Sequence, residues 1–156
     1  MSANLSGSYP ATAKAARAAR HALVDFAAAA GASDEKLEAI HLAACEALTN
    51  VVVHAYREVA GSIHVNAAVI EDELWVIVAD DGSGMQPRRD SPGLGYGLKL
   101  IADAADEVTI VARASAGTEV RMRFDLRDGG RFGDDQVRGS VASATAPAPS
   151  PFSTTR

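Results

Sequence analysis

A carboxylate and an amide interrupt an otherwise apolar stretch, Leu42 to Tyr56, which reads LAACEALTNVVVHAY. These groups belong to Glu46 and Asn50, and the four-residue spacing puts them on one face of a helix, with His54 continuing the row. Polar groups among apolar neighbours cost desolvation free energy unless something pairs with them. Such a break in the local pattern is typical of a site, so we expect Glu46 and Asn50 to serve a ligand.

A second candidate group follows an apolar run that reads LWVIVA. There, Asp80, Gly82 and Gly84 form an Asp-x-Gly-x-Gly pattern. A carboxylate at a strand end can accept a hydrogen bond from an exocyclic amine such as that of adenine. The glycines allow the backbone to approach a ligand closely. The same segment, DDGSG, is also typical of a plain turn, so both interpretations stay open.

Three alternating glycines, Gly93, Gly95 and Gly97, come immediately before an apolar helical pattern that begins at Leu98. Glycines before a helix expose backbone N–H groups at its positive end, which suits phosphates. The pattern is not the dinucleotide fingerprint, because Leu98 occupies the position of the third glycine, and the chain has no P-loop. A flexible hinge is the alternative interpretation.

Two helices are predicted to carry the first candidate group. An alanine-rich segment over residues 11–30, ended by Gly31, predicts the first helix. Ser33 or Asp34 would cap the second, which runs to about Arg57. The first helix has a basic side that we interpret as a solvated face, with a partner contact as the alternative; this side comprises Lys14, Arg17, Arg20 and His21.

Alternating apolar residues predict strands over residues 63–69, 108–112 and 120–124. The uniformly apolar run over 74–79 predicts a central strand, and Leu5 with Tyr9 suggests a short edge strand. The first two strands would form a hairpin around residues 71–73. This order of elements favours an α+β fold, a two-layer sandwich with the helices packed on one face of a mixed sheet.

The composition limits the class of protein. With 156 residues, of which 47% are hydrophobic, the chain is long enough for one domain with a core. A net charge of −5 argues against nucleic acid as a partner. The single cysteine, Cys45, excludes an intramolecular disulfide and fits a reducing compartment. Because we find no signal peptide and no apolar run that could span a bilayer, we expect a cytoplasmic protein without a membrane partner.

Residues 128–156 differ from the rest, being rich in Gly, Ser, Pro and Ala with little to bury. We predict that they form a disordered tail, and that residues 8–127 form the folded domain.

The order of the motifs is more specific than any one of them. The chain carries Glu46-x-x-x-Asn50, Asp80-x-Gly82-x-Gly84, Gly93-x-Gly95-x-Gly97 and Gly117-Thr118. Over about residues 8–126 this combination resembles the GHKL superfamily of gyrase, chaperone, histidine-kinase and mismatch-repair ATPases. The stretch CEALTNVVVHAY and the short lid, residues 85–92, most resemble the anti-sigma-factor serine kinases.

This resemblance implies a role for each motif residue. Glu46 would be the general base, Asn50 a Mg²⁺ ligand, and Asp80 the partner of the adenine amine of ATP. The remaining residues would contact the nucleotide: Gly82 and Gly84 at the adenine pocket, Gly93, Gly95 and Gly97 around the phosphates, and Thr118 at the adenine end. For His54 a packed, hydrogen-bonded role is expected rather than a catalytic one, and for Lys99 a surface position.

The resemblance also implies an activity. The chain would be an ATP-dependent serine/threonine protein kinase acting as an anti-sigma factor, with Mg²⁺ as cofactor. Its partners would be a STAS-domain anti-sigma-factor antagonist, a sigma factor and a second copy of the chain. One alternative is a nucleotide-binding regulatory module without phosphotransfer. Another is a histidine-kinase catalytic domain, which is disfavoured because His21 is the sole histidine in the first 40 residues and lacks a helical hairpin partner.

Overall fold

The computed structural model describes residues 3–56, 59–83 and 94–127. The predicted lid over residues 85–92, the glycines Gly84 and Gly93, and the predicted tail over residues 128–156 all lie outside the described residues.

Five strands form one sheet with the order β1-β2-β3-β5-β4, and every neighbouring pair is antiparallel. The two-layer α+β architecture is therefore confirmed, but the sheet is antiparallel where a mixed one was expected. The reason is that β3 and β4 run in the same direction with β5 inserted between them, so these two strands never pair. The strands span Asn4–Pro10 (β1), Ser62–Ile70 (β2), Glu73–Asp80 (β3), Glu107–Ala112 (β4) and Thr118–Asp125 (β5).

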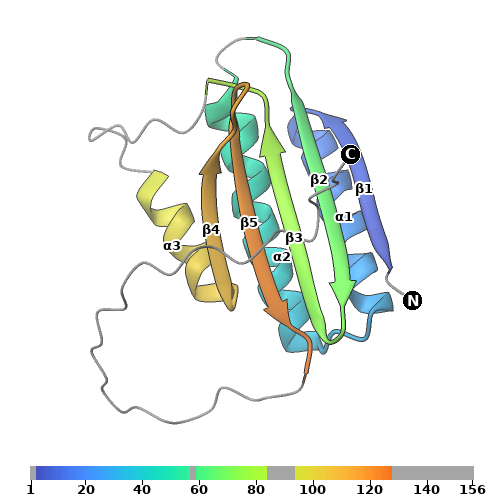
Figure 1. Ribbon diagram of the computed structural model, residues 1–156. Helices are drawn as coiled ribbons and strands as arrows, with labels where there is room; N and C mark the ends of the chain where they lie inside the picture. Colours follow the sequence, from blue (N-terminus) through green and yellow to red (C-terminus); the bar gives the residue numbers. More distant parts are fainter. Residues whose placement is uncertain (1–2, 57–58, 84–93, 128–156) are drawn as a thin grey trace, which may run out of the picture.

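Three α-helices cover one face of this sheet (Figure 1). Thr12 caps α1 by accepting the Ala15 N–H at 3.2 Å, and Ser33 caps α2 by accepting the Lys36 N–H at 3.4 Å. These side chains satisfy donors that have no partner within the helix, which fixes where each helix begins. The helices span Ala13–Ala29 (α1), Asp34–Asn50 (α2) and Leu94–Ala104 (α3), and α2 continues into a π-helical turn, η1, over Val51–Ala55.

The core lies between the helices and the inner face of the sheet. Alternate residues of β5 are buried, which agrees with the period-two pattern of the sequence. The largest fully buried side chains come from both layers and include Leu23, Ile40, Ile63, Leu74, Ile101, Met122 and Phe124. This core fixes α2 and α3 relative to the strands, and so fixes the residues that they carry.

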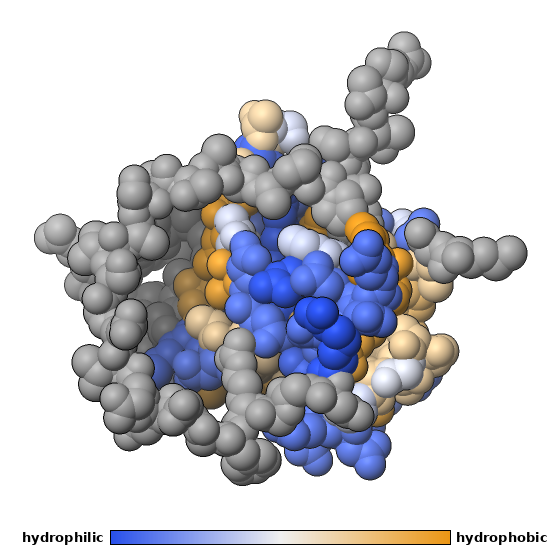
Figure 2. Space-filling model, turned by 60° about the horizontal axis from the view of Figure 1, so that its bottom comes forward, coloured by the Kyte–Doolittle hydropathy of each residue, from blue (hydrophilic) through white to orange (hydrophobic). Residues whose placement is uncertain are grey.

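Hydrophilic residues gather in a patch on the molecular surface in Figure 2. On the outer face of the sheet, Arg123 pairs with Glu73 at 2.8 Å and with Glu107 at 3.2 Å. Among the described helices, none combines the length and the apolar character needed to cross a membrane.

Candidate functional site

The carboxylate and the amide of α2 lie directly against the start of α3. Gly97 is buried there, and a Cβ atom at this position would stand 3.0 Å from Glu46 Oε2 and 3.6 Å from Asn50 Oδ1. The absence of a side chain at Gly97 therefore lets the two polar groups lie beside the backbone of α3. Two motifs that are more than 40 residues apart in the sequence meet at this point.

The amide nitrogen of Asn50 is buried and finds no hydrogen-bond partner among the described residues. A buried donor without a partner costs roughly 1–3 kcal/mol, so it marks a position where a ligand is expected to contribute. The described residues contain no group of three or more His, Cys, Asp or Glu side chains that could hold a metal.

The helix changes geometry immediately after Asn50. Residues 51–53 are three valines, whose branched side chains have little rotamer freedom in an α-helix, and here η1 has π-type geometry. Because a π-turn bonds residue i to i+5, it rotates later residues out of the row that Glu46 and Asn50 begin. His54 is accordingly exposed, so the expectation that it would be packed was wrong.

The second motif is built around a buried carboxylate. Asp80 is only 5% exposed, and its Oδ1 accepts the Gly82 N–H at 2.9 Å. The N–H of Thr118, a residue that is also buried, bonds to the same carboxylate. Burial raises the pKa of Asp80 above its ordinary value, and the two N–H bonds oppose this rise. The structure thus holds a carboxylate oriented by the backbone, together with the predicted residues Gly82 and Thr118.

Two glycines close the space around Asp80. Gly117 has a φ of +91°, and a Cβ atom there would fall 1.9 Å from the carbonyl oxygen of Asp80. A Cβ atom at Gly82 would fall 2.1 Å from the carbonyl oxygen of Ala55, which also accepts the Ser83 N–H at 3.2 Å. Since Ala55 ends η1, the helix with Glu46 and Asn50 is tied to the loop that carries Asp80.

The third motif differs from its predicted conformation. The helix was expected from Leu98, with the glycines in the preceding loop, but α3 begins at Leu94 and so contains both Gly95 and Gly97. Leu94, Leu98 and Ile101 stand at helical spacing, so the apolar pattern already starts at Leu94. Lys99 is exposed, as expected for a surface lysine.

Several residues around Asp80 were not singled out from the sequence. Arg113 donates to the Asp80 carbonyl at 3.0 Å and also pairs with Asp81. Asp81 further pairs with His64, and its N–H donates to the Tyr56 hydroxyl at 2.8 Å. The doubled acid in DDGSG was the available signal, because it places a second carboxylate beside the first.

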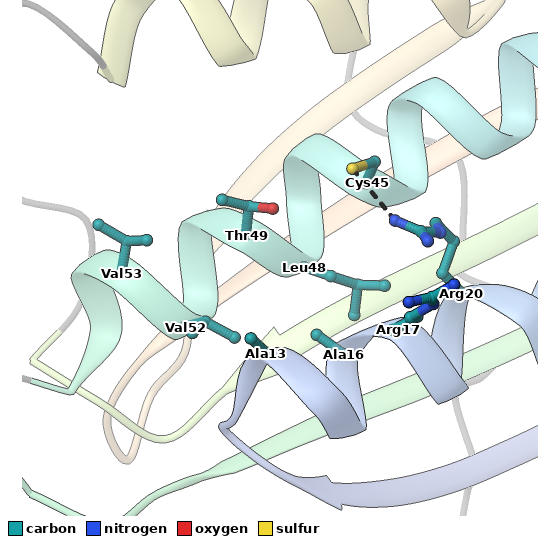
Figure 3. A pocket seen from close by; sticks show the side chains of 9 residues that line it. All are labelled: Ala13, Ala16, Arg17, Arg20, Cys45, Leu48, Thr49, Val52 and Val53. Carbon is teal, nitrogen blue, oxygen red and sulfur yellow. Dashed lines mark hydrogen bonds between the residues drawn. The ribbon is translucent and has the colours of Figure 1, made fainter.

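A groove of about 340 Å³ lies on the other side of α2, where α2 faces α1 (Figure 3). In this groove, Arg20 donates to the Cys45 sulfur at 3.4 Å. The basic side of α1 is therefore only partly the solvated face that was expected: Arg17 is exposed, but Arg20 packs against α2. The lining residues are Ala13, Ala16, Arg17, Arg20, Cys45, Leu48, Thr49, Val52 and Val53.

Comparison with known proteins agrees with this geometry. The profile of the histidine kinase-like ATPase domain matches residues 9–124. The chain belongs to this family. It is 30% identical over 115 residues to an anti-sigma F factor of Caldanaerobacter subterraneus subsp. tengcongensis, which covers 67% of this chain and 80% of that protein. It is 36% identical over 110 residues to the serine-protein kinase RsbW of Bacillus licheniformis, covering 68% and 69% of the two chains.

A solved structure shares the fold. The crystal structure of the RsbU and RsbW domains of Rv1364c from Mycobacterium tuberculosis aligns with a TM-score of 0.65 and 27% sequence identity. The alignment covers 85% of this chain and 35% of that one, so this chain matches about a third of the larger protein. The predicted GHKL fold and the relationship to anti-sigma-factor kinases are confirmed, and the family implies that the domain binds ATP.

Proposed function

We propose that this protein is an ATP-dependent serine/threonine protein kinase that acts as an anti-sigma factor. It would phosphorylate a STAS-type anti-sigma-factor antagonist and bind a sigma factor as its alternative partner, working as a homodimer. The observation that carries this proposal is the contact of Gly97 with both Glu46 and Asn50, since it brings a carboxylate and an amide to the glycine-containing start of α3.

Glu46 is the proposed general base. Its carboxylate is half-buried on α2, one helical turn before Asn50, and Oε2 faces the backbone at Gly97. In this position it would accept the proton of the attacking hydroxyl of a serine or threonine. Base catalysis of this kind contributes on the order of 10²–10⁴ to a rate.

The other site residues would bind and orient the nucleotide. Asn50 would ligate Mg²⁺ through its side-chain oxygen, which faces Gly97. Asp80 would accept the adenine amine, and Thr118 and Gly82 keep the Asp80 carboxylate in place. When bound, Mg²⁺-ATP supplies the phosphoryl group and the positive charge that balances the phosphate oxygens. Gly97 gives the phosphates close access to the backbone of α3. We also assign Gly93 and Gly95 to the phosphates, and Gly84 to the adenine pocket with Gly82.

The proposal is tested by phosphotransfer from γ-labelled ATP to a purified STAS-domain antagonist. Glu46→Gln should lower the rate about 100-fold or more while nucleotide affinity changes less than about twofold, because the amide cannot accept the proton. Glu38→Gln is the matched control, because Glu38 is exposed on the same helix and should leave the rate unchanged. Asn50→Ala should lose the Mg²⁺-dependent part of nucleotide binding.

The outcomes separate the alternatives. Unchanged phosphoserine formation in the Glu46 variant would rule out Glu46 as the base. Nucleotide-dependent capture of a sigma factor without phosphotransfer to any partner would instead favour a regulatory binding module. An acid-labile phosphate on the acceptor would indicate histidine-kinase chemistry.

A further inference from the structure

A chain of polar contacts runs across the outer face of the sheet to the back of the nucleotide carboxylate. It begins at Ser8 on β1, whose hydroxyl lies 3.2 Å from His64 Nδ1 on β2. The other ring nitrogen, His64 Nε2, pairs with Asp81, and Asp81 in turn pairs with Arg113. We call His64, Asp81 and Arg113 the brace.

Both polar groups of the Asp80–Asp81 peptide are hydrogen-bonded: its carbonyl to Arg113 of the brace, and its N–H to Tyr56. Arg113 donates from one nitrogen to the Asp80 carbonyl at 3.0 Å and to the Asp81 carboxylate. The Asp81 N–H donates to the Tyr56 hydroxyl, which itself donates to the Ser62 carbonyl at 2.7 Å. The segment that carries Asp80 is thus held from β2, from η1 and from the end of β4.

The brace acts on Asp80 without occupying its ligand-binding side. The Asp80 carboxylate is engaged by the N–H groups of Gly82 and Thr118, whereas the brace holds its carbonyl and the next residue. Gly117 packs against that same carbonyl. A change in the strength of the brace would therefore alter how firmly Asp80 is held, without removing either N–H bond to its carboxylate.

We propose that His64, Asp81 and Arg113 position Asp80 for the nucleotide base, and that protonation of His64 tightens nucleotide binding. This inference rests on the proposed function, because it assumes that Asp80 receives the adenine amine. The three brace residues are positioning residues, since none of them would touch the nucleotide.

The physical reason is the charge on the histidine. Histidine is the side chain that ordinarily gains or loses its proton between about pH 5 and 8. Neutral His64 can donate one N–H to Asp81, whereas protonated His64 makes this bond charge-assisted and also donates to Ser8. If the braced arrangement is the one that binds nucleotide, protonation increases its population and hence the apparent affinity.

The groups that face His64 come from the strands packed around it. From β3 and the residue after it come Ala79 and Asp81, and from the end of β4 comes Arg113, whose charge Asp81 already shares. Beyond Ala79, β5 contributes Glu119, which pairs with Arg121. Tyr56 reaches the site only through the Asp81 N–H. The Asp81 carboxylate faces His64 directly.

The expected effect is small, because the His64 and Asp81 side chains are 33% and 48% exposed. Exposed ion pairs are typically worth up to about 1 kcal/mol, which corresponds to an affinity change on the order of threefold. By reciprocity, bound nucleotide should make His64 keep its proton to a higher pH.

The test is a calorimetric titration of the full chain with Mg²⁺ and a non-hydrolysable ATP analogue, from about pH 6 to about pH 8.5. His64→Gln keeps a donor toward Asp81 but cannot become charged. His21→Gln is the control, because His21 is an exposed histidine on α1 outside the brace. Titration of the nucleotide and of Asp80 is common to all three proteins, so the difference between their profiles isolates His64.

Between the acidic and the alkaline end, the affinity of the native chain and of His21→Gln for the analogue should fall about threefold more than that of His64→Gln. An NMR titration of the His64 ring, with and without the analogue, gives a second readout that a purely structural role would not move.

Identical pH profiles for the native chain and His64→Gln would overturn the inference while leaving the proposed function intact. Failure of the native chain to bind the analogue at any pH would overturn both. Should His64→Gln not fold, Asp81→Asn serves instead and should flatten the profile in the same way.

Discussion

The two ends of the candidate site differ in how their polar groups are paired. The Asp80 carboxylate has two backbone N–H donors, and the backbone carbonyl of Asp80 accepts a hydrogen bond from Arg113. Around Glu46 and Asn50, in contrast, the Asn50 amide is buried without a partner among the described residues, and Gly97 leaves the neighbouring position open. One end is complete without a ligand, and the other is not.

The difference matches two requirements on the polar groups of a binding site. A group that recognises a neutral base gains from being held rigidly in advance, because less ordering is left to the moment of binding. In the proposed function, the unpaired N–H donors of Asn50 are left for the ligand, and leaving them unpaired costs free energy in the unbound state. The stability of the Asp80 end and the incompleteness of the Asn50 end can be tested separately.

The largest expected effect is on the closely packed Asp80 end. Gly117→Ala should lower the free energy of unfolding by about 3 kcal/mol or more, because it combines a strained positive φ with overlap against the Asp80 carbonyl. Gly31→Ala is the matched control: Gly31 has nearly the same φ, +90°, but open space around it, so the loss should be about 1 kcal/mol. Urea unfolding of both variants checks this, and equal losses would show that the packing against Asp80 contributes nothing.

A smaller effect, with the opposite sign, is expected at the incomplete end. Asn50→Leu should raise the free energy of unfolding by about 1 kcal/mol in the absence of nucleotide, because it replaces an amide whose nitrogen is buried and unpaired with an apolar group of similar size. The same variant should lose Mg²⁺-dependent nucleotide binding, a trade of function for stability. Urea unfolding and nucleotide calorimetry check the two halves. A destabilised Asn50→Leu would mean that the amide is already satisfied in the free protein.

The sequence predicted the elements and motifs at both ends of the site better than the contacts between them. The first two helices, the hairpin and the Ser33 cap follow from local patterns, and Asp80 with Gly82 could be recognised because they are close together in the chain. The contact of Gly97 with Glu46 and that of Gly117 with Asp80 depend on the insertion of β5 between β3 and β4. No local pattern encodes that insertion, since it is decided by which strand buries its apolar face best in the assembled sheet. The π-turn after Asn50 was missed for a related reason: apolar periodicity does not distinguish it from continued α-helix.

The smallest effect compares two neighbouring carboxylates in acid. Burial raises the pKa of Asp80, so its contribution to stability is fully present below the unfolded value of 3.8 and is lost as pH rises through the folded value. The hydrogen bond with His64 lowers the pKa of Asp81, so its contribution is present above 3.8 and is lost as pH falls. The unfolding free energies of Asp80→Asn and Asp81→Asn are each subtracted from that of the native chain across the acidic range. The two differences should therefore have slopes against pH of opposite sign. The slope for Asp81 should amount to less than about 1 kcal/mol, because its side chain is 48% exposed. Slopes of the same sign would mean that the two carboxylates share one environment, and that the buried end of the site is not separated from the brace behind it.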